Sequence, residues 1–136
     1  MLDACIMGLR YYAIIFGLTF AMGIARALVI APRLGETVGV LLEEPIILIA
    51  SWFTLRHLLG HSYLTLAQRM TMGTTAFTLT MASEVVLAGY LRGQSVFKWA
   101  TDILAPLGLI GLGGQIGFAI LPVIVGHRRR LRPHYD

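Results

Sequence analysis

Apolar residues follow one another along this chain in four long stretches, separated by short segments rich in charged residues, proline and glycine. A helix needs roughly 20 apolar residues to cross the hydrocarbon core of a bilayer, which is about 30 Å thick. Each stretch is that long, so the pattern predicts an all-α integral membrane protein built as a bundle of four transmembrane helices. The predicted spans are residues 6–31, 37–59, 70–91 and 103–126.

The connections between the predicted spans are short. Segment 32–36 combines proline and glycine and is expected to form a tight turn, because proline ends a helix and glycine accepts a left-handed conformation. Segments 60–69 and 92–102 are the only predicted loops, and neither is long enough to hold a folded soluble domain. Residues 1–136 are therefore predicted to form a single transmembrane domain.

The loop 92–102 contains Phe97, Lys98 and Trp99 in succession. Aromatic rings and the ammonium group of a long lysine side chain both favour the headgroup level of a membrane. These three residues predict an anchor at the membrane interface.

Composition supports lipid as the main solvent of this chain. Hydrophobic residues make up 57% of the sequence and charged residues only 13%, against about a quarter in soluble proteins. The net charge of +4 could suggest nucleic acid as a partner, but basic residues cluster in segment 127–136, directly after the last span. A cluster so placed is typical of a topology determinant that contacts anionic lipid headgroups. Its arginines are Arg128, Arg129, Arg130 and Arg132.

An even number of spans puts both termini on one side of the membrane, and the basic tail makes that side cytoplasmic by the positive-inside rule. The sequence thus predicts a multi-pass protein of the cytoplasmic (inner) membrane. Its expected partners are membrane lipids and either further copies of itself or another membrane protein, and no nucleic acid.

Charged residues inside a membrane are costly and therefore mark candidate sites. At about 1.5 Å per residue, Arg26 lies roughly 8 Å below the outer end of the first span. Glu43, Glu44 and Glu84 lie about 10 Å deep on the second and third spans. The four residues are predicted to form one polar layer in which Arg26 holds the glutamates through its fork of donors, with Arg33 of the adjacent turn as a further member.

Three carboxylates cannot all stay ionised beside one deep arginine, so at least one is expected to carry a proton near neutral pH. Glu84 is the predicted one, with Thr80 as its hydroxyl partner one turn back. Adjacent helical residues point about 100° apart, so Glu43 and Glu44 must face different neighbours. Glu43 shares its side with Gly39 and is predicted to face inward. Glu44 shares its side with Ser51 and Leu55, which is more lipid-like, and is predicted to face a second subunit or a cavity.

Pro45 follows Glu44 and has no N–H group, so the second span should be kinked with the carbonyl of Leu41 left open. The fourth span carries Gly113 and Gly117, spaced for close helix packing, and Gln115 near the midplane. The glycines predict packing within the bundle, an oligomer interface or the lining of a path.

Residues with catalytic or metal-binding chemistry are sparse. His57 and His61 have the spacing of a helical zinc pair, but no third ligand is near and the chain has one cysteine. No nucleophile with an adjacent base, phosphate-binding loop or cofactor motif is present. The sequence predicts no cofactor, no metal and no enzymatic activity.

Two functions remain compatible with the predicted polar layer. In the first, the protein is a non-enzymatic accessory or scaffold subunit, and the layer orders its helices. In the second, it is a small oligomeric transporter or channel whose carboxylates carry protons or cations.

Overall fold

The computed structural model describes residues 1–130, with side chains as far as His127. These residues form helices joined by short connections, and none of them is in a strand, which confirms the all-α prediction. The α-helices are α1 (Leu2–Ala25), α2 (Ala31–Leu34), α3 (Glu36–Leu58), α4 (Leu66–Arg92), α5 (Val96–Ile103) and α6 (Pro106–Arg130). A π-helical turn (Arg26–Ile30) joins α1 to α2, and a 3₁₀ turn (Leu59–His61) follows α3.

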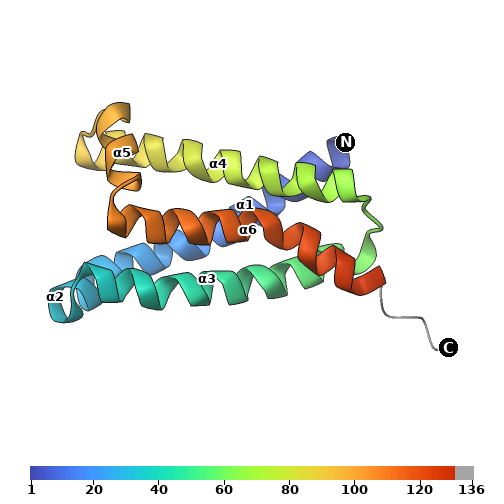
Figure 1. Ribbon diagram of the computed structural model, residues 1–136, viewed down its shortest axis with the longest axis horizontal. Coiled ribbons are helices and arrows are strands. Elements are labelled where there is room, and N and C mark those ends of the chain that lie inside the picture. Colours follow the sequence, from blue (N-terminus) through green and yellow to red (C-terminus); the bar gives the residue numbers. More distant parts are fainter. Residues whose placement is uncertain (131–136) are drawn as a thin grey trace.

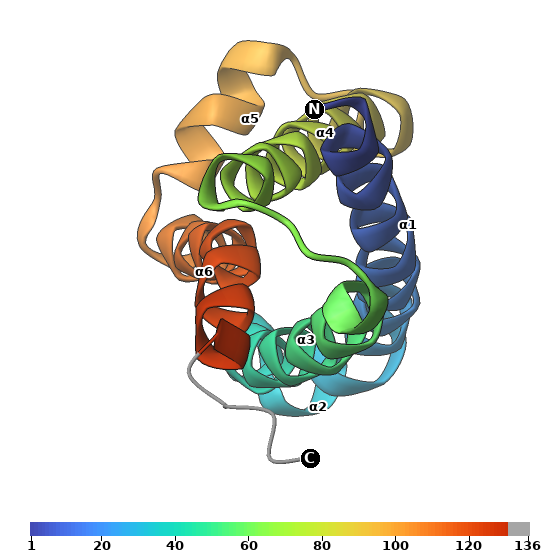
Figure 2. The same ribbon diagram turned by 90° about the vertical axis from the view of Figure 1, so that its right-hand side faces the viewer.

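The four long helices α1, α3, α4 and α6 lie side by side along one axis (Figure 1). Seen along that axis they form a ring in which each helix contacts two neighbours, in the order α4, α1, α3, α6 (Figure 2). The start of α1 and the end of α6 lie at the same end of the bundle, and α2 and α5 lie at the opposite end (Figure 1).

Three helical segments of the described chain are long and apolar enough to cross a membrane. They are Leu2–Leu34, Glu36–His61 and Pro106–His127. The remaining long helix, α4, has 27 residues and hence sufficient length, but its composition is more polar. The membrane character of the chain thus rests on α1 with its extension, α3 and α6, and a fourth span formed by α4 stays a prediction.

The first helical segment is longer than expected, because it continues through the predicted turn 32–36 to Leu34. Pro32 has no N–H group to donate to the carbonyl one turn before it, and the chain widens here into a π-helical turn in which the Ala31 N–H bonds to the Arg26 carbonyl. The reversal occurs at Gly35 alone, whose φ of 87° suits a residue without a side chain.

The second predicted loop, 92–102, is also wrong in part, since it contains α5. Ser95 caps this helix by accepting a hydrogen bond from the Lys98 N–H at 3.1 Å. The loop 60–69 is shorter than predicted, because Thr65 and Gln68 form a capping box that starts α4 at Leu66.

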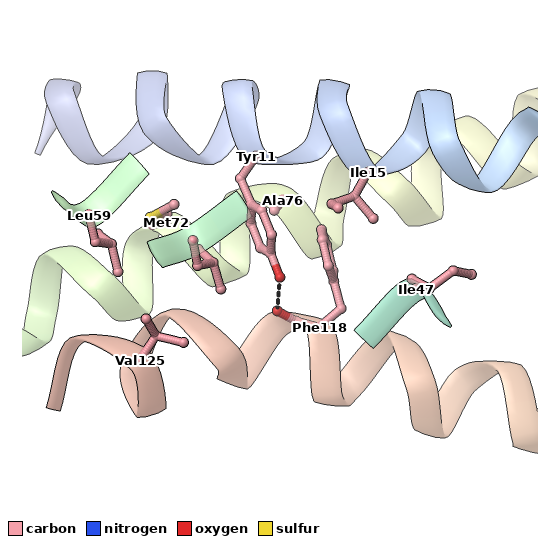
Figure 3. Close-up of a cluster of buried hydrophobic side chains, with 9 residues drawn as sticks. Tyr11, Ile15, Ile47, Leu59, Met72, Ala76, Phe118 and Val125 are labelled. Atoms are coloured by element: carbon pink, nitrogen blue, oxygen red, sulfur yellow. Dashed lines mark hydrogen bonds between the residues drawn. The ribbon is translucent and has the colours of Figure 1, made fainter. Parts of the chain in front are cut away.

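The core of the bundle is centred on Tyr11 of α1, which reaches across the ring to α6 (Figure 3). Its ring stacks on that of Phe118 with centroids 4.2 Å apart, and its hydroxyl donates to the Phe118 carbonyl at 2.9 Å. That carbonyl has no helical donor because the residue four positions later is Pro122. The tyrosine therefore satisfies an acceptor that the proline exposes inside an apolar environment.

Glycines bring the helix backbones together on both sides of α4. A Cβ atom on Gly8 of α1 would lie 2.7 Å from the Met72 carbonyl oxygen, and one on Gly73 would overlap the Ala119 carbonyl of α6. The obstructing atoms belong to the backbone and cannot move aside. These contacts have the small-residue geometry common between membrane helices.

Candidate functional site

Arg26 lies at the first position of the π-helical turn and binds two carboxylates of α3. Its Nε atom donates to Glu43 Oε2 at 2.8 Å, and a terminal guanidinium nitrogen donates to Glu36 Oε2 at 2.5 Å. The Glu43 side chain is 10% exposed and that of Glu36 is 55% exposed. The arginine thus spans from the interior of the bundle to its surface.

The backbone around Arg26 is shaped to let its side chain cross to α3. A Cβ atom on Gly39 would lie 2.8 Å from the Arg26 Cγ and Cδ atoms, so the stem of the arginine occupies the space that a side chain would fill. Gly39 and Glu43 are one turn apart on the same side of α3. Together they form a groove and an acceptor for one guanidinium.

Glu36 was not predicted to take part in this site. It lies seven residues before Glu43, two helical turns, and so on the same side of α3. That spacing was a sequence signal for a second acceptor. Arg33, which was predicted to join the layer, lies exposed on α2 and forms no ion pair with any residue that the structure describes.

The buried side of α3 differs from the predicted one. Its buried residues recur every four positions. Ser51 and Leu55 lie among them, although the sequence placed both on the lipid-like side shared with Glu44, and each is fully buried. Glu43 also lies on the buried side, where Arg26 binds it. The full set is Gly39, Glu43, Ile47, Ser51 and Leu55.

Glu44 lies on the side of α3 that faces α6. Its carboxylate occupies the position that a side chain at Gly114 would take, and it also lies 3.7 Å from the place of a Cβ atom on Gly111. Among the described residues it forms no hydrogen bond and no ion pair. Glu44 is therefore a half-buried carboxylate held against helix backbone without a cation bound to it.

Glu84 of α4 accepts a hydrogen bond from the Gln115 side-chain amide of α6. The predicted partner, Thr80, instead donates to the Ala76 carbonyl of its own helix at 2.9 Å. A threonine in a helix can bond to the carbonyl one turn back, and that local bond competes with any bond to Glu84. The side-chain oxygen of Gln115 is buried and has no partner among the described residues.

The two glycines of the predicted packing motif have different surroundings. Gly117 lies against Leu48 of α3, 3.3 Å from the place of its Cβ atom, whereas Gly113 is exposed with no atom within 4 Å of that place. The glycine that α3 packs against at the level of the glutamates is Gly114. Gly113 leaves a gap on the outer side of α6.

Arg69 is a second buried arginine, which the sequence analysis assigned to a loop. It is 4% exposed and lies on the first turn of α4, where it donates to the Val123 carbonyl of α6 at 3.1 Å. Its stem fills the space beside Gly126. Arg128, Arg129 and Arg130 form the last turn of α6, and Arg132 lies outside the described residues.

Glu44 of α3 and Glu84 of α4 both lie against α6, at Gly114 and Gln115, and neither forms an ion pair among the described residues, although the Arg92 charge acts on Glu84. Glu44 lies within electrostatic range of Glu43, Glu84 and Arg26, but Arg26 is already bound to Glu43 and Glu36. The site can thus be divided into a paired half, on α1 and α3, and an unpaired half, formed by Glu44, Glu84 and Gln115. The paired half can hold helices together, and the unpaired half can accept protons or cations.

The described residues contain no group of three or more histidines, cysteines, aspartates or glutamates placed to hold a metal ion. Comparison of the chain with protein-family models, with curated proteins and with solved structures finds no match in any of the three.

Proposed function

We propose that this chain is a small multi-pass protein of the cytoplasmic membrane that performs no enzymatic chemistry and acts as an accessory or scaffold subunit. The observation that supports this proposal best is the binding of Arg26 to both Glu43 and Glu36. An arginine that binds two carboxylates of the neighbouring helix fixes how those helices are arranged.

The surface of the bundle agrees with a structural role. One hollow lies between α3 and α6 and another between α1 and α4, and apolar side chains line both except for Ser83. No carboxylate lines either hollow. Apolar hollows of this kind suit acyl chains or a neighbouring membrane helix better than a hydrated ion.

The test of the structural role is a double-mutant cycle on Arg26 and Glu43 in detergent micelles. Removing either partner alone strands a charge and should lower stability, while removing both should restore much of the loss. Additive losses in the double variant would contradict a structural pair.

A second candidate function is a small oligomeric transporter or channel for protons or cations. Glu44 favours it, because a half-buried carboxylate that forms no ion pair with a described basic side chain is the kind of group such a protein needs. A proton or cation flux in proteoliposomes that is lost in Glu44→Gln or Glu84→Gln would support this candidate.

A further inference from the structure

Helix α5 (Val96–Ile103) is set apart from the ring of long helices. It lies at the end of the bundle and runs across the direction of α4 and α6 (Figure 1). Seen along the bundle, it lies outside the ring, beside α4 and α6, which are the helices that it contacts (Figure 2). Because the long helices end at this level, α5 lies where the hydrocarbon core of a surrounding bilayer gives way to the headgroups.

The sequence of α5 is divided into an apolar and a polar side. At about 100° per residue, its apolar residues fall on one continuous arc and its polar residues on the opposite one. The apolar arc, extended to the residue that follows the helix, consists of Val96, Phe97, Trp99, Ala100, Ile103 and Leu104. The polar arc consists of Lys98, Thr101 and Asp102.

The bundle covers only part of the apolar arc. Trp99, Ala100 and Ile103 are half-buried. The other three apolar residues are open, with Val96 64% exposed, Phe97 79% and Leu104 64%. Phe97 and Leu104 lie together at one edge of the apolar arc and Val96 lies at the first position of α5, and we call these three residues the uncovered strip.

The polar arc is held by its own hydrogen bonds. Lys98 Nζ bonds to Asp102 Oδ1, and Gln94 Nε2 donates to Asp102 Oδ2 at 3.0 Å. With the Ser95 cap, these bonds fix α5 as a helix and fix the direction in which the uncovered strip points.

We propose that α5 is a membrane-surface helix whose uncovered strip inserts into the interfacial region of the bilayer around the bundle. The neighbouring helix α4 also ends in open apolar side chains, with Tyr90 87% and Leu91 63% exposed. Aromatic residues at this level and a lysine stem beside them are typical of an interfacial helix. This inference rests on the membrane placement of α1, α3 and α6 and holds for either proposed function.

The experiment places a fluorophore on each side of α5. In a Cys5→Ser background, Phe97→Cys and the matched control Thr101→Cys are labelled with nitrobenzoxadiazole and reconstituted into vesicles of phosphatidylcholine and phosphatidylglycerol. Both positions are exposed, so labelling leaves the bundle intact. The Phe97 label should emit at shorter wavelength, be quenched several-fold more strongly by lipids carrying a nitroxide about 5–10 Å below the headgroups, and resist aqueous iodide.

Equal quenching of both labels by iodide would overturn the inference, because the strip would then face water. Protection from iodide without quenching by the labelled lipids, together with disulfide crosslinking of the unlabelled Phe97→Cys variant, would assign the strip to a second copy and also overturn it. Val96→Cys repeats the measurement at the start of the strip. Circular dichroism of each variant shows that the helices remain folded.

Discussion

The paired half and the unpaired half of the site meet on α3 at Glu43 and Glu44. The first of these carboxylates is in an ion pair and the second is not. Glu43 has a guanidinium within 2.8 Å, while its sequence neighbour Glu44 rests on a glycine of α6 without a cation. The two side chains are neighbours in the sequence and point about 100° apart around α3, so they meet different helices. The difference teaches that adjacent carboxylates in a membrane helix can serve different purposes, one fixing the architecture and the other remaining available to a proton or cation.

The largest expected effect is that of breaking the paired half. Arg26→Leu should lower the free energy of unfolding by about 3 kcal/mol, the low end for a broken buried pair, because the Arg26 side chain is 28% exposed. Unfolding in mixed micelles measures the loss. The double variant with Glu43→Gln should regain most of it, and a double variant as unstable as Arg26→Leu alone would show that the pair does not order the helices.

A smaller effect should separate the two glycines that accommodate the charged side chains. Gly39→Ala would push on the Arg26 stem and should cost about 1–2 kcal/mol, because the guanidinium must leave its partners. Gly114→Ala is the matched change in the unpaired half. It should cost less, since the Glu44 carboxylate has no bond to lose when it swings away. Equal losses in the same unfolding assay would remove the distinction between the halves.

Neutralising the unpaired half should leave stability almost unchanged. Glu44→Gln removes a charge that forms no ion pair among the described residues and should shift the free energy of unfolding by no more than about 0.5 kcal/mol in either direction. Glu43→Gln serves as the control, since it removes an acceptor from Arg26. If Glu44→Gln destabilises the protein as strongly as Glu43→Gln, then Glu44 has a structural partner after all.

The smallest effect concerns the Lys98–Asp102 ion pair of α5. This pair is exposed to solvent, unlike the buried pair of Arg26 and Glu43. The hydrogen bond from Lys98 lowers the pKa of Asp102 below its usual range, with smaller contributions from the Lys98 charge and from Gln94. A lowered pKa in the folded state means that the pair stabilises α5 above the usual aspartate pKa of about 3.9, and that this contribution is lost as the pH falls through the lowered value.

The hydrogen-exchange protection factors of the α5 amides, which are corrected for the intrinsic pH dependence of exchange, should therefore fall on acidification below that range, while global unfolding hardly changes. Asp102→Asn is the control and should abolish the pH dependence of these protection factors. Protection factors that stay equally pH-dependent in this variant would assign the effect to another group.

Much of the fold could be predicted from the pattern of apolar residues, but the connections could not. The four long helices overlap the four predicted stretches, and three of the helical segments are long and apolar enough to cross a membrane. An apolar run of about 20 residues has few other structures in lipid. Pro32 was taken as a helix end. It lies instead in the first turn of α2, where its missing N–H costs little, and the chain reverses at Gly35.

The sequence predicts how deep each residue of the candidate site lies along its helix. It does not predict which side of the helix the residue lies on. Depth along each helix follows from counting residues, and Glu44 lies near enough to Glu43, Glu84 and Arg26 for their charges to act on it. Which side of α3 is buried depends on how α3 packs against α1 and α6, and that packing is not visible in the sequence. The same limit explains why Ser51 was placed on the wrong side of α3 and Gln115 was not matched with Glu84.

The most direct measurement of the central claim is a flux assay on the folded protein in proteoliposomes, following internal pH and a panel of monovalent cations. The proposed accessory or scaffold role predicts no flux above empty vesicles for the wild-type chain, alongside the recovery of stability in the Arg26→Leu/Glu43→Gln variant. A flux that disappears in Glu44→Gln, a variant expected to fold normally, would contradict that role and make the unpaired half a conduction site.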